Sequence, residues 1–106
     1  MTTNGRAHAY ELMMVAVGQL ATGTGRIQDR LHSALLEFHQ LETAGFPSEA
    51  TRHKFAYLMK ALGVGSVKRD QVAANLDGLG DDEAAQYARR VYDLFLDTAR
   101  DYFRQP

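Results

Sequence analysis

In four segments of the chain, apolar residues recur every three or four positions, and short glycine-containing connections separate these segments. This spacing places apolar side chains on one face of an α-helix. No window alternates with the period of two that a half-buried strand requires. We therefore predict an all-α fold. The four main helices are expected over residues 7–21, 26–43, 47–62 and 81–103, and a short helix over residues 67–76 precedes the last one.

The predicted connections contain residues that end or begin helices. Gly45 and Gly63 are natural helix terminators, and Pro47 suits the first turn of the third helix. Because the connections are short, neighbouring helices are expected to be antiparallel and to form a compact bundle. A chain of 106 residues has the size of one domain. We predict a single helical domain over residues 1–106, with residues 1–5 as a disordered tail.

Gly18 interrupts the first predicted helix, where glycine costs about 1 kcal/mol relative to alanine. We interpret it as a point of close approach by another helix. The apolar face of this helix is expected to consist of Tyr10, Met13, Met14, Val17, Leu20 and Ala21.

The last predicted helix carries aromatic side chains on more than one face: Tyr87, Tyr92, Phe95, Tyr102 and Phe103. A domain of this size has limited interior in which to bury all of them. We therefore predict a homodimer with this helix at the interface. The core-facing stripe of the helix is expected to be Ala85, Ala88, Tyr92, Phe95, Ala99 and Tyr102. The central cluster of the fold is expected to join Leu35, Phe38, Phe55, Leu58, Tyr92 and Phe95.

The composition excludes several classes of protein. Twelve basic and 13 acidic residues give a net charge of −1, which argues against a broadly basic nucleic-acid coat. The absence of cysteine excludes disulfides, cysteine-ligated metals and thiol catalysis, and it suits a reducing compartment. The longest apolar run, Leu12 to Val17, is far shorter than the ~20 residues that span a bilayer. We expect no membrane partner, no secretory signal and a cytoplasmic location.

Neither the histidines nor the acidic residues form a pattern typical of catalysis or metal binding. His32 and His39 are about 10 Å apart along one predicted helix, too far to share a metal. Asp93, Asp97 and Asp101 form a row on the last helix, but arginines are interleaved with it. Such a row is typical of a solvated face with weak ion pairs. We predict no catalytic residue, no metal, no cofactor and no enzymatic activity.

One charged segment stands out, because residues 50–69 contain five basic residues and no acidic one: Arg52, Lys54, Lys60, Lys68 and Arg69. This charge suits a surface that binds an acidic protein. We predict a small non-enzymatic accessory protein that binds a protein partner through helix faces, with Arg52, Lys54, Lys68 and Arg69 in contact with the partner.

A nucleic-acid-binding regulator is the alternative, because residues 47–76 have the order helix, tight turn, helix. Counted from Gly63, a helix-turn-helix requires a small residue four positions earlier and a β-branched apolar residue six positions later. Met59 and Arg69 occupy these positions, so the motif fits poorly. Salt-dependent binding to nucleic acid would distinguish the regulator from a protein-binding module.

Three stretches carry a resemblance: ATGTGRIQDRLHSALLEFHQL from Ala21 to Leu41, Gly65-Ser66-Val67, and Asp81-Asp82-Glu83-Ala84-Ala85. In this order they resemble segments of a family of small all-helical bacterial proteins that has no assigned activity. The resemblance touches about half of the chain. It implies a bacterial helical protein, and it transfers no catalytic residue to this sequence.

Overall fold

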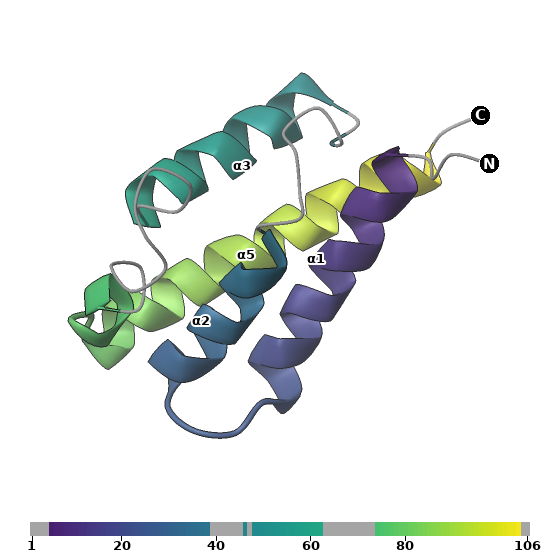
Figure 1. Ribbon diagram of the computed structural model, residues 1–106. Helices are drawn as coiled ribbons and strands as arrows, with labels where there is room; N and C mark the ends of the chain where they lie inside the picture. The colour runs from purple at the N-terminus through teal and green to yellow at the C-terminus, as the bar shows by residue number, and fades with distance from the viewer. Residues whose placement is uncertain (1–4, 39–45, 47, 63–73, 105–106) are drawn as a thin grey trace.

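The computed structural model describes residues 5–38, 46, 48–62 and 74–104, and within these ranges it contains helices and no strand (Figure 1). The main helices are α1 (Gly5–Thr22), α2 (Ile27–Glu37), α3 (Glu49–Leu62) and α5 (Asp81–Phe103). Residues 74–77 form a short helix before α5. The predicted all-α fold, with four main helices and a short one before the last, is confirmed. Of the residues predicted for the short helix, 67–73 lie outside the described residues.

Helix α5 lies at the centre of the arrangement, because α1, α2 and α3 all pack against it (Figure 1). Helix α1 is antiparallel to α5, so the start of α1 lies beside the end of α5. Helix α3 crosses the other flank of α5 and also runs antiparallel to it. As a result, α5 has to present two different packing surfaces along its length.

The connection between α1 and α2 depends on glycine. Gly25 has a φ of +95°, in the left-handed region that L side chains rarely adopt. Just beyond it, the Arg26 guanidinium lies 3.5 Å from Asp29 and 2.8 Å from Asp77. These two carboxylates, Asp29 foremost, raise the pKa of Arg26. The start of α2 is thereby tied to the last residue of the short helix.

The buried amide of Gln28 makes a second connection between the same two regions. Its Nε2 donates to the Leu79 carbonyl at 3.0 Å and to Asp81 Oδ1 at 2.9 Å. A buried NH₂ group is stable in a core only when it donates hydrogen bonds, so these two bonds fix the first turn of α2 against the start of α5.

An aromatic cluster links α2 to α3. The ring of Phe55 lies 5.6 Å from that of Phe38 and 4.7 Å from that of Phe46, centroid to centroid. All three rings are buried, and they belong to a core that also contains Leu35 and Leu58. The expected meeting of α2 and α3 side chains is therefore present.

The buried line of α5 differs from the predicted stripe. Its most buried residues are Ala84, Val91, Leu94 and Thr98, whereas Tyr92 is 42% exposed. The expectation that Tyr92 belongs to the central cluster is therefore wrong. Phe95 is partly buried at the margin of the core and stacks on Tyr10 of α1, with centroids 6.1 Å apart.

The buried line of α5 differs from the predicted stripe because α5 is covered on two flanks. On one side of this line, Phe95 and Tyr102 stack on Tyr10 of α1. On the other side, Asp97 and Asp101 contact α3 and its cap. A threonine occupies this line because the Thr98 hydroxyl donates to the Leu94 carbonyl at 2.7 Å. That bond satisfies its polar group without a neighbouring helix.

The interpretation of Gly18 as a point of close approach by another helix is not met by any helix that the structure describes. Apart from its own helix, no atom of the described residues lies within 4 Å of the position that a Cβ would occupy. A side chain at this position would therefore meet open space.

We predict that Phe55→Ala lowers the free energy of unfolding by about 3–5 kcal/mol, because it removes the ring that joins Phe38 and Phe46. Tyr92→Ala removes a side chain of similar size from the surface, and it is expected to lower the free energy of unfolding by only about 1 kcal/mol. Urea denaturation of the two variants measures the difference. Equal losses would contradict the observed orientation of α5.

Candidate partner-binding groove

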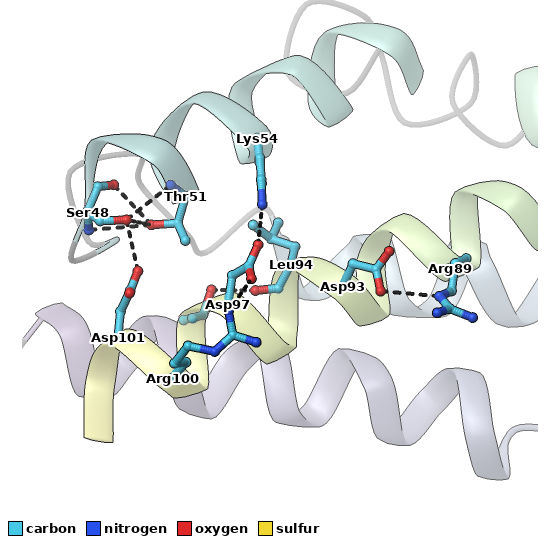
Figure 2. A network of polar contacts seen from close by, with 10 residues as sticks. Ser48, Thr51, Lys54, Arg89, Asp93, Leu94, Asp97, Arg100 and Asp101 are labelled. Atoms are coloured by element: carbon cyan, nitrogen blue, oxygen red, sulfur yellow. Dashed lines mark hydrogen bonds and ion pairs between the residues drawn. The ribbon is translucent and has the colours of Figure 1, made fainter. Parts of the chain in front are cut away.

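Two aspartates of α5 hold α3 in place (Figure 2). The Lys54 ammonium contacts Asp97 Oδ2, and the Ser48 hydroxyl donates to Asp101 Oδ2 at 2.8 Å. The Asp97 side chain is only 20% exposed, and Arg100 donates to its other oxygen at 3.4 Å. The expectation of a solvated aspartate row is therefore wrong for Asp97 and Asp101.

Ser48 and Thr51 fix the position at which α3 begins. The Thr51 backbone N–H donates to Ser48 Oγ at 3.2 Å, and the Ser48 N–H reaches Thr51 Oγ1 at 3.4 Å. This reciprocal pattern satisfies amide groups that a helix start leaves without intrahelical partners. Because Ser48 also donates to Asp101, the same cap attaches α3 to α5.

Two of the predicted partner-contacting cations have roles within the chain. The half-buried Arg52 donates through Nη1 to the Phe46 carbonyl at 3.2 Å, next to the aromatic cluster. Lys54 is paired with Asp97. The other two predicted contacts, Lys68 and Arg69, lie outside the described residues. Arg52 and Lys54 therefore contribute to the attachment of α3 as well as to the charge of the segment.

Towards the end of α3, the two helices leave a groove with a volume of about 640 Å³. Buried Leu58 and Leu94 form its floor. The ring of Tyr57 stands at its rim and is 68% exposed. We call this the α3–α5 groove. It is lined by Tyr57 and by His53, Lys54, Ala56, Leu58, Lys60, Arg90, Asp93 and Leu94.

The rim of the α3–α5 groove is positively charged. Asp93 is already paired with Arg89 at 3.2 Å. Within the part of the chain that the structure describes, neither Lys60 nor Arg90 has an ion pair. The guanidinium of Arg90 lies over the ring of Tyr87, 5.2 Å from its centroid. This cation–π contact leaves the charge of Arg90 uncompensated at the rim.

The sequence pattern identified Lys60 as part of the basic segment, but it missed Tyr57, Arg90 and Leu94. Helical spacing indicates that Arg90 and Leu94 share a face of α5 with Asp97 and Asp101, because these residues recur at three- and four-residue intervals. This shared face was missed because acidic and basic residues alternate along the helix.

The aromatic residues of α5 that were predicted at a dimer interface are divided between the inside and the surface. Tyr102 stacks on Tyr10 at 5.0 Å, which absorbs part of its area within the chain. Tyr87, like Phe95, is partly buried against the core. Tyr92 and Phe103 remain exposed, and Phe103 packs edge-on to Tyr10 at 5.3 Å.

In the ranges that the structure describes, no group of three or more histidine and acidic side chains is placed to hold a metal ion. None of the described helices combines the length and apolar character needed to cross a membrane. Comparison of the chain with protein-family models, curated proteins and solved structures finds no match.

We predict a measurable coupling between Lys54 and Asp97. In a double-mutant cycle with Lys54→Met and Asp97→Asn, about 0.5–1 kcal/mol of coupling is expected, since Lys54 is exposed to solvent. High salt should reduce the coupling, because it screens exposed charges. Thermal unfolding of the four proteins at low and high salt provides the measurement. Strictly additive effects would mean that this ion pair does not hold α3.

Proposed function

We propose that this protein is a non-enzymatic interaction module that binds an acidic, amphipathic helix of a partner protein in the α3–α5 groove. The observation that carries the proposal is an apolar floor, made by Leu58 and Leu94, beneath a rim with two uncompensated cations, Lys60 and Arg90. Apolar contact supplies affinity, and the cations select the charge of the partner.

The shape of the groove supports a helical partner. Helix α3 and α5 are antiparallel neighbours, and the space between such helices accepts side chains that project from one face of a third helix. Tyrosine is enriched among the residues that dominate binding energy, and Tyr57 presents its ring to solvent at the rim. Since the rim residues are largely exposed, the groove is open along its length, which favours a macromolecule over an enclosed small ligand.

The proposed contacts differ from those that the sequence pattern suggested. Arg52 and Lys54 retain their place in the basic segment, but their contacts with Phe46 and Asp97 hold α3 in position. In this proposal the partner is contacted by Tyr57, Lys60 and Arg90 instead. Association in the cytoplasm of a bacterial cell agrees with the cysteine-free composition, which suits a reducing compartment.

Nucleic acid is the alternative ligand of the same region. Phosphate recognition uses several cations along a backbone, and its affinity falls steeply with salt. At the α3–α5 groove, Lys54 is already bound to a carboxylate and the floor is apolar. These features favour a protein partner, and a duplex serves as the competing ligand in the test.

We predict that a labelled helical peptide with leucine on one face and glutamate on the other binds the protein. A peptide of the same length with lysine in place of glutamate should bind at least about tenfold more weakly. Tyr57→Ala and Lys60→Glu should each weaken binding of the glutamate peptide by about tenfold or more. Fluorescence anisotropy at two salt concentrations measures these affinities.

Arg90→Glu and Arg104→Glu make a matched pair for the same assay. Both arginines are exposed on the last helix or at its end, but only Arg90 lines the groove. Arg90→Glu should weaken binding, and Arg104→Glu should leave it unchanged. Equal affinity for both peptides would contradict the proposal. Preference for a DNA duplex, with a steep salt dependence, would favour the nucleic-acid alternative.

A further inference from the structure

Helix α1 carries large apolar side chains that are exposed to solvent. Met14 is 46% exposed and Val15 is 43% exposed, although α1 already buries Leu12 and Met13 against the core. A helix that is apolar on all sides is normally buried on all sides. Among the described helices, α1 packs on α2 and α5, and none of them covers its outer side (Figure 1).

The exposed side of α1 continues onto α5. At one end of the seam between the two helices, exposed Phe103 packs against Tyr10 at 5.3 Å. At the other end, exposed Tyr92 lines a hollow of about 580 Å³ together with Val17 and Ala21. Met14 on α1 and Leu96 on α5 lie between these ends in sequence, and both are exposed. The α1–α5 face is defined here by Met14, Val15, Tyr92, Leu96 and Phe103.

Gly18 lies on the same side of α1. Glu11, Met14, Val15 and Gly18 follow the spacing of one helix face, three, four and seven residues from the first. Among the described residues nothing packs against Gly18, so the chain itself gives no steric reason for a glycine there. A helix of another molecule would find room for close approach at this position.

We propose that the α1–α5 face binds a second copy of this chain. Self-association needs a face that tolerates its own charges, because a twofold axis brings the same surface together from both molecules. Among the described side chains of α1, Glu11 is the one with a formal charge. Near the opposite end of the seam, the exposed Arg89 of α5 contacts Asp93 through its Nε at 3.2 Å. An antiparallel arrangement of two copies brings Glu11 of one towards Arg89 of the other.

The α3–α5 groove does not suit the same occupant. Lys60 and Arg90 would meet Lys60 and Arg90 of the other copy, and like charges oppose such contact. Because of this difference in charge, we assign the acidic partner helix to the α3–α5 groove and the second copy of the chain to the α1–α5 face.

The α1–α5 face also has the necessary size. Helices of 18 and 23 residues are about 27 and 35 Å long. Stable interfaces bury about 800 Å² on each partner. Two adjacent helices of this length, each about 10–12 Å wide, span an area of this order. The exposed aromatic and aliphatic side chains supply its apolar centre.

Sedimentation equilibrium of the full chain over a range of concentrations tests the proposal. The wild-type protein is expected to form dimers. Gly18→Glu and Leu96→Glu should each weaken the dimer by at least about tenfold. Leu36→Glu introduces the same charge at an exposed leucine of α2, outside the α1–α5 face, and should change the dissociation constant by less than about twofold.

Loss of folding does not confuse the result, because glutamate is a better helix former than glycine and position 18 faces open space. The helical circular-dichroism signal of Gly18→Glu should therefore equal that of the wild type at concentrations where both are monomeric. Wild-type protein that stays monomeric at high micromolar concentration would overturn the proposal. A dimer that tolerates Gly18→Glu and Leu96→Glu would also overturn it, since another face would then form the interface.

Discussion

The structure depends on the way in which α5 is buried along two flanks at once. One flank receives α1 through stacked aromatic rings, with Tyr10 between Phe95 and Tyr102. The other receives α3 through carboxylates, with Asp97 and Asp101 holding Lys54 and Ser48 (Figure 2). Salt screens an exposed ion pair, whereas it does not screen the stacking of apolar rings. Helix α3 therefore combines polar contacts that respond to salt with buried apolar contacts, among them Phe55 of the aromatic cluster and Leu58.

The helices could be predicted because their signals are local. Apolar spacing, terminating glycines and the proline before α3 act within a few residues, so they indicate where helices begin and end without knowledge of the neighbours. The rotation of α5 could not be predicted in this way. Tyr92 has more apolar area than Thr98, yet Thr98 is buried and Tyr92 is exposed. What decides between them is the presence of partners on both flanks, and that is a property of the assembled bundle. The short reach of the Thr98 hydroxyl to the Leu94 carbonyl then makes the polar residue acceptable in the core.

The candidate site shows the same division between local and tertiary information. A cluster of cations between residues 50 and 69 is visible in the sequence, but which charges remain available depends on the acidic residues that fold against them. Asp97 lies 43 residues away from Lys54 along the chain and neutralises it. Arg90, which belongs to a helix of mixed charge, keeps its positive charge beside the groove. Charge segregation in a sequence therefore indicates a region, and the ion pairs of the folded chain determine which residues in it can recognise a partner.

Gly18 connects the helix pattern to the question of assembly. A glycine inside an exposed helix lowers the stability of that helix by about 1 kcal/mol relative to alanine. Within the described part of the bundle no tight contact offsets this cost, because a Cβ at position 18 would have free space around it. The neighbouring exposed Met14 and Val15 impose a cost of the same kind, since their apolar area stays in contact with water. Both costs disappear when another helix covers this side of α1, because close approach then makes use of the missing side chain while the flanking apolar groups become buried. A single packing event thus accounts for two features of α1 that the isolated chain leaves without a physical reason.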